Sequence, residues 1–118
     1  MTLAEILIDA LSRSRERFDR ALADVTLEQA NTPPVPDIAP RTNSLTWLAW
    51  HTAREIDLQI SLMAGQEFVW FTGGHRERFD LPLPDDTQDW RHTPEEAAQV
   101  VVGDLSVLTA YLDDAYAM

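Results

Sequence analysis

Residues 43–65 read NSLTWLAWHTAREIDLQISLMAG, and the spacing of their apolar side chains decides the fold. Thr42 or Asn43 can cap a helix and Gly65 can end it, so the pattern predicts a helix over residues 43–64. Its apolar residues form two adjacent stripes: Leu45, Leu48, Ala49, Thr52, Ile56, Ile60 and Met63 in one, and Trp47, His51, Leu58 and Leu62 in the other. At about 100° per residue, the stripes cover more than half of the circumference. We therefore expect a central helix with more than one neighbour.

Another helix is predicted before it, over residues 3–24. Thr2 and Glu5 form a capping box, and apolar residues follow at helical spacing. Residues 26–31 then repeat a Thr-x-x-Gln capping pattern, and four prolines exclude a regular helix or central strand across residues 32–41. These prolines are Pro33, Pro34, Pro36 and Pro40. We expect an ordered connection that is too short to separate two domains.

The last predicted helix covers residues 94–117. Thr93 serves as its N-cap, Pro94 takes the first helical position, and two glutamates follow in the first turn. Before it, residues 66–92 read as a long irregular excursion that ends in an acidic run, Asp85 to Asp89. The excursion also contains Trp70, Phe71 and Phe79. Such aromatic side chains usually tie a loop to the core, which argues against disorder.

Together these patterns predict an all-α fold, an up-down bundle of three helices in a single domain over residues 1–118. A chain of this length can bury about two-thirds of the surface that it exposes when unfolded. The apolar faces of two helices are too wide for a three-helix bundle to cover. We therefore expect either a fourth helix beyond residue 118 or a second copy of the chain against them.

Composition excludes several classes of protein. The chain has no cysteine, which rules out disulfides, thiolate metal ligands and cysteine nucleophiles. The net charge is -11, and the chain has no basic stripe for phosphate backbones, so we expect no nucleic-acid partner. There is neither an apolar run of about 20 residues nor a signal-peptide pattern, which predicts no membrane partner and a cytoplasmic location.

His51 is the candidate metal ligand. It lies on the second apolar stripe, where an imidazole could bind a divalent ion through one ring nitrogen. A histidine flanked by Trp47 and Trp50 can equally be a core or interface residue. Glu55, one turn later on the same face, could add a carboxylate ligand or orient the ring, or it could form an ion pair at the surface. The two tryptophans and Glu55 are the candidate pocket residues.

Other polar residues carry weaker signals. His75 and His92 stand on the excursion without a second histidine at helical spacing, so we expect them at the surface. Asp104 falls between two apolar flanks of the last predicted helix, which would leave it partly buried. Placement at a helix edge would explain the same pattern. No G-x-S-x-G elbow and no glycine-rich phosphate loop is present.

Three stretches resemble the DinB-like (YfiT-like) superfamily, which includes mycothiol-dependent maleylpyruvate isomerase and low-molecular-weight-thiol S-transferases. They are VTLEQAN at residues 25–31, NSLTWLAWH at residues 43–51, and a third that runs from Gly73-Gly74 through RFDLPLP at residues 78–84 to HTPEE at residues 92–96. Their order is that of the family, and together they span nearly the whole chain.

The resemblance implies a four-helix bundle, often dimeric, that holds zinc or nickel through three ligands at one end. His51 matches the ligand on the second helix. The other two ligands belong to a fourth helix, for which this sequence has no counterpart. The implied function is metal-dependent S-transfer with a low-molecular-weight thiol. The alternative is a non-catalytic helical module that forms a homodimer or binds a partner through its uncovered apolar flanks.

Overall fold

The computed structural model describes residues 1–39, 41–87 and 91–118. Pro40 and Asp89, from the predicted connection and acidic run, lie outside these ranges. The described residues form helices and no strands, which confirms the all-α prediction. The helices are α1 (Leu3–Ala23), α2 (Leu27–Ala30), α3 (Leu45–Ala64), α4 (Val69–Thr72), α5 (His75–Phe79), α6 (Pro94–Ala97) and α7 (Leu105–Tyr116).

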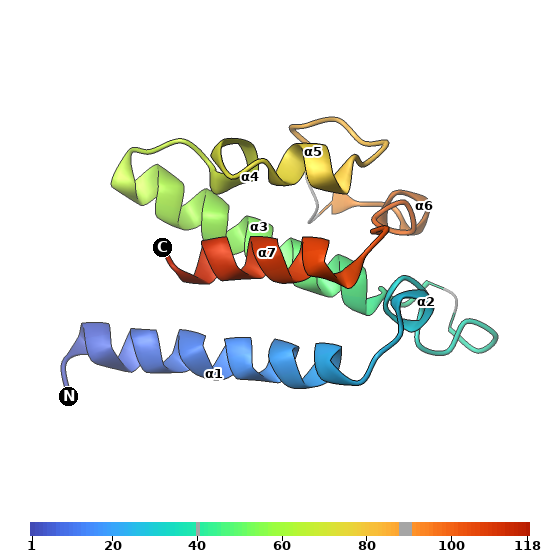
Figure 1. Cartoon of the computed structure of the whole chain (residues 1–118), viewed down its shortest axis with the longest axis horizontal. Coiled ribbons are helices and arrows are strands. Elements are labelled where there is room, and N and C mark those ends of the chain that lie inside the picture. Colours follow the sequence, from blue (N-terminus) through green and yellow to red (C-terminus); the bar gives the residue numbers. More distant parts are fainter. Residues whose placement is uncertain (40, 88–90) are drawn as a thin grey trace.

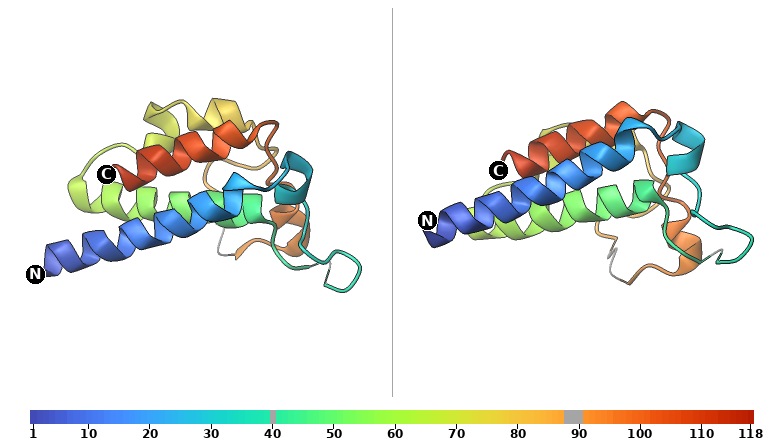
Figure 2. Two further views of the ribbon diagram at one scale, coloured as in Figure 1. Left: turned by 60° about the horizontal axis from the view of Figure 1, so that its bottom comes forward. Right: turned by 90° about the horizontal axis from the view of Figure 1, so that it is seen from below.

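The three long helices α1, α3 and α7 lie side by side and form the bundle (Figure 1). α1 runs in one direction, and α3 and α7 both run in the other. Because α3 and α7 are parallel, the chain between them must return along the bundle, and this returning segment carries α4, α5 and α6. α4 and α5 cover the side of the bundle opposite α1 (Figure 2).

Local capping explains where most helices begin and end. Thr2 with Glu5, and Thr26 with Gln29, form the predicted capping boxes at the starts of α1 and α2. Ser44 caps α3, one or two residues after the predicted cap. The helix ends at Gly65, whose φ of 67° lies in the left-handed region that glycine adopts without strain.

The last helix differs from its prediction. Thr93 and Glu96 form a capping box, but α6 ends at Ala97, and α7 begins only at Leu105. The residues between them include three consecutive valines and Gly103, which are poor helix formers. Asp104 is exposed and accepts a hydrogen bond from the Ser106 backbone N–H at 2.7 Å, so it is the N-cap of α7 and not a partly buried helical acid.

The excursion over residues 66–92 is more regular than predicted, because it contains α4 and α5. Trp70 and Phe79 are buried in the main core cluster, as expected of aromatic side chains that tie a loop to the core. Phe71 remains 39% exposed. The excursion is therefore a packed layer of the bundle along much of its length.

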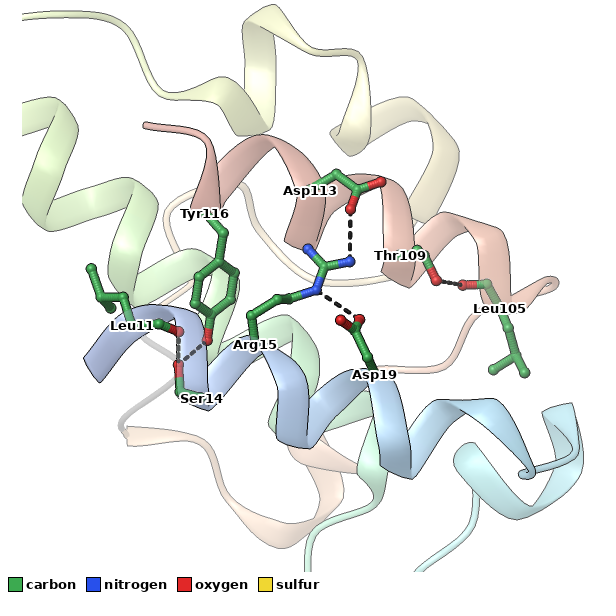
Figure 3. Close-up of polar contacts among 8 residues, drawn as sticks. All are labelled: Leu11, Ser14, Arg15, Asp19, Leu105, Thr109, Asp113 and Tyr116. Carbon is green, nitrogen blue, oxygen red and sulfur yellow. Dashed lines mark hydrogen bonds and ion pairs between the residues drawn. The ribbon is translucent and has the colours of Figure 1, made fainter. Parts of the chain in front are cut away.

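The core lies mainly between α3 and α7, where the largest buried side chains include Trp50, Leu108 and Tyr111. α1 contributes no buried residue and attaches to α7 partly through polar contacts. Arg15 bridges Asp19 at 2.9 Å and Asp113 at 2.7 Å, and Ser14 bonds the Tyr116 hydroxyl (Figure 3). α1 is thus held less firmly than the other two long helices.

One long surface of the bundle remains uncovered. On α3, five residues at helical spacing are exposed or half-buried, and we call them the outer stripe: Leu48, His51, Glu55, Leu58 and Leu62. Its three leucines are between 38% and 67% exposed. The first turns of α1 add Leu3, Ile6, Leu7, Ile8 and Leu11, all exposed. No helix in the described part of the chain is long and apolar enough to cross a membrane.

Candidate functional site

His51 lines a hollow of about 330 Å³ where the start of α3 meets the start of α6. Its imidazole stacks on the Trp47 indole, with ring centroids 4.6 Å apart and planes 15° from parallel. The hollow is lined by Arg41, Asn43, Trp47, His51, His92, Thr93, Pro94 and Ala97. Two of the predicted site residues, His51 and Trp47, are therefore brought together here. His51 also belongs to the outer stripe, so whatever covers that stripe would lie beside this hollow.

His92 lines the same hollow and is half-buried, which corrects its prediction as a surface residue. The Trp47 indole N–H donates to its Nδ1 at 3.2 Å, and its Nε2 lies 2.8 Å from the Thr87 hydroxyl. Its ring stacks on Trp50 at a centroid distance of 5.6 Å. Because both ring nitrogens already contact side chains, His92 bridges the excursion and α3.

The residues around His51 do not fit a complete metal site. Across residues 1–39, 41–87 and 91–118, no group of three or more histidine, aspartate or glutamate side chains could hold a metal ion. Zinc is usually held by three protein ligands in catalytic sites and by four in structural sites. His51 can supply one nitrogen ligand, and any further ligands would have to come from elsewhere.

The other predicted pocket residues, Trp50 and Glu55, lie at different hollows. Trp50 is buried in the core and borders a small hollow of about 200 Å³. Glu55 lines a larger one, of about 430 Å³, between α3, α4 and residues 85–87. Within the described residues Glu55 forms no ion pair, and its polar contact is a long one, 3.5 Å from the Gln59 amide. The four predicted site residues therefore do not form one pocket.

Arg54 was not among the predicted site residues. Its guanidinium lies 5.1 Å from the Trp50 ring centroid and 5.6 Å from that of Trp70, and it donates to the Thr87 carbonyl at 3.1 Å. It lines both hollows on that side of α3. Sequence alone gives little signal for this, since the two indoles that hold Arg54 come from separate helices.

A buried carboxylate, Asp57, holds α4 against α3. It is 2% exposed, and its oxygens accept hydrogen bonds from the Ser61 hydroxyl, the Val69 and Trp70 backbone N–H groups and the Tyr111 hydroxyl, at 2.8 to 3.0 Å. The sequence contained an indication of this buried carboxylate, because Asp57 stands among apolar residues of the central helix. Four donors saturate the carboxylate, so its role is structural.

His75 is also buried, at 1% exposure, and its prediction as a surface residue was wrong. Its Nε2 lies 2.6 Å from an Asp114 carboxylate oxygen, which ties α5 to α7. A Cβ at Gly73 would come within 2.8 Å of both groups, so only glycine fits there. In the sequence, the glycine pair before His75, and not His75 itself, indicated that other groups approach the backbone closely here.

Comparisons with solved structures and with protein-family models both find similar proteins. The chain matches the crystal structure of a conserved protein from Enterococcus faecalis with a TM-score of 0.88 and 46% sequence identity. The match covers 99% of this chain but only 66% of that protein, so the chain spans just under two-thirds of its relative's length. No curated protein matches the chain. Residues 10–118 match the family model of the DinB superfamily, and the chain therefore belongs to the DinB superfamily.

Proposed function

We propose that the chain is a DinB-type domain that supplies one ligand, the His51 imidazole, to a divalent metal site whose other ligands come from outside the described residues. The position of His51 carries this proposal. It lies on the outer stripe of α3, it borders a hollow, and its ring is held by Trp47. A helix that packed along the stripe would bring its side chains to His51, whether it belonged to the same protein or to a second copy.

Zinc or nickel is the proposed ion, because an imidazole suits both and the chain has no thiolate to offer. The chemistry that such an ion supplies is activation of a bound thiol or water by a lowered pKa. The reaction that we propose at this site is S-transfer with a low-molecular-weight thiol, in the cytoplasm. This part of the proposal rests on the resemblance to family members. The chain's own residues would position the ion and shape the space beside it.

The test is the metal content of protein purified without a histidine tag, measured by mass spectrometry. We expect near-stoichiometric zinc or nickel in the wild type and its loss in His51→Ala. His92→Gln is the matched control from the same hollow, and it should retain the metal because both His92 nitrogens already contact side chains. Metal retained in His51→Ala, or absent from every sample, would contradict the proposal.

A second candidate function, a non-catalytic packing module, is favoured by the exposed leucines of the outer stripe and of α1. Such a surface is typical of an interaction site, and a second copy of the chain could cover it. Sedimentation velocity should then show a dimer that dissociates in a Leu58→Gln, Leu62→Gln double variant. Ile38→Gln is the control, because Ile38 is 86% exposed on the 32–41 connection. A monomeric wild type without metal would argue against this function.

A further inference from the structure

A candidate second site is the hollow of about 430 Å³ between α3, α4 and residues 85–87. Its size falls in the range of small-molecule pockets, about 300 to 1,000 Å³. It is lined by Arg54, Glu55, Asp57, Leu58, Phe68 and Phe71, together with Trp70, Asp85, Asp86, Thr87 and Tyr111. It shares no lining residue with the hollow at His51, so a ligand here needs no metal.

Aromatic rings provide an apolar wall. Phe68 and Phe71 stand nearly parallel, with centroids 6.3 Å apart and planes 19° apart. Phe68 is half-buried and Phe71 is exposed, so their rings are only partly covered by the protein itself. Trp70 is buried beneath and packs at a centroid distance of 5.1 Å from Tyr111. A ligand with a flat apolar group could cover the exposed rings.

Among the described residues that line this hollow, Arg54 is the one cation. Two indoles hold its guanidinium, and its hydrogen bond goes to a carbonyl, at Thr87, and not to a carboxylate. The remaining N–H groups of the guanidinium can make a bidentate contact with a ligand carboxylate. Beside it, Trp70 is 5% exposed, and its indole N–H has no acceptor among the described residues.

The carboxylates of the hollow differ in how far they are already neutralised. Asp57 is saturated by four donors, and Asp85 pairs with Arg76 at 2.9 Å. Glu55 and Asp86 have no cationic partner within the described residues. They would repel a simple anion, and the chain's net charge of -11 would add to that repulsion. A ligand that satisfies both Arg54 and these two acids must carry both charges.

We propose that this hollow binds a small zwitterion of the amino-acid class with an apolar side chain. Its carboxylate pairs with Arg54, its ammonium faces Glu55 and Asp86, and its apolar group packs on Phe68 and Phe71. This binding is independent of the metal proposed at His51, and either proposal can fail without the other.

Three probes that share a phenyl group but differ in their charged groups separate the contributions. Phenylalanine carries both charges, 3-phenylpropionate only the carboxylate, and 2-phenylethylamine only the ammonium. We expect calorimetry, or quenching of the tryptophan fluorescence, to show phenylalanine binding at least about tenfold more tightly than either of the others, because each loses one charge-assisted contact. Equal affinity for all three, or no binding at millimolar concentration, would overturn the proposal.

Substitutions test which residues contact the carboxylate and the ammonium of the ligand. Arg54→Lys keeps the positive charge but loses the planar guanidinium that can donate two parallel hydrogen bonds to a carboxylate. It should weaken phenylalanine binding by about tenfold and leave the affinity for 2-phenylethylamine unchanged. Arg13→Lys, at an exposed pair with Asp9, is the control and should bind as the wild type does. Should Arg54→Lys fail to fold, Asp86→Asn tests the ammonium side, and it should weaken phenylalanine but not 3-phenylpropionate. Unchanged binding in folded Arg54→Lys or in Asp86→Asn would refute the assignment.

Discussion

The two faces of α3 differ in how deeply their carboxylates are buried and how many hydrogen bonds these accept. The inner face carries Asp57, which is 2% exposed and accepts hydrogen bonds from four donors. The outer stripe carries His51 and Glu55 between exposed leucines, and Glu55 has no ion-pair partner within the described residues. A saturated buried network fixes a structure, whereas an exposed apolar surface that carries polar side chains is typical of an interaction site. We therefore expect substitutions on the buried face, at Asp57, to affect mainly stability, and substitutions on the outer stripe to affect mainly binding.

The largest effect is expected for Asp57→Ala, on the buried face of α3. Several donors would lose their acceptor at about 1–3 kcal/mol each when buried, so we expect a loss of ~3–5 kcal/mol in the free energy of unfolding. Urea denaturation followed by circular dichroism measures it. Asp86→Asn, at an exposed acid, is the control and should stay near wild type. A loss below about 1 kcal/mol for Asp57→Ala would mean that water replaces the carboxylate, since ordered water can bond buried polar groups.

Gly73→Ala tests the packing of the layer over the inner face. The new Cβ would meet His75 Nε2, Asp114 Oδ2 and the Val69 carbonyl at 2.7 to 2.8 Å, so overpacking should cost about 1–3 kcal/mol. Gly103→Ala is a matched control, because nothing lies within 4 Å of its Cβ position. Its effect should stay within about 0.5 kcal/mol. Thermal unfolding compares the two, and equal midpoints would show that α5 can shift away from α7.

Leu62→Gln probes the outer stripe. Leu62 is 67% exposed, so removing its apolar surface should change the free energy of unfolding of the monomer by no more than about 0.5 kcal/mol. Chemical denaturation at low protein concentration is the measurement. A larger loss that grows with protein concentration would show instead that the stripe is already covered in solution, by a second copy of the chain.

The smallest expected effect concerns pH and the start of α6. Hydrogen bonds from the Thr93 backbone N–H and hydroxyl lower the pKa of Glu96 below its ordinary value of 4.5. Because the pKa is lowered in the folded state, the resulting stability is fully present above pH 4.5 and is lost as the pH falls through the lowered pKa. Compared with Glu96→Gln, the wild type should therefore lose stability on acidification, as denaturation at pH 7 and pH 3 would show. A constant difference between the two proteins would exclude this contribution.

Local sequence was sufficient wherever the cause of a structure was itself local. The capping boxes at Thr2 and Thr26 and the stop at Gly65 occur as predicted, since each depends on residues a few positions apart. Prediction failed for His75, whose burial depends on Asp114, 39 residues away. It failed for the last helix as well, because the strong start at Thr93 says nothing about the valines that follow Ala97.

By itself, the sequence determined an all-α chain with a broad apolar central helix, an acidic surface unsuited to nucleic acid, and His51 as the residue to test for metal. Only the tertiary structure decided that α3 and α7 run parallel, that Asp57 and His75 are structural, and that Arg54 sits between two indoles above a hollow. The reason is the range of the interactions. Periodicity and capping act within one helix, whereas burial and hydrogen bonding of polar side chains are set by whichever distant segments the fold brings together.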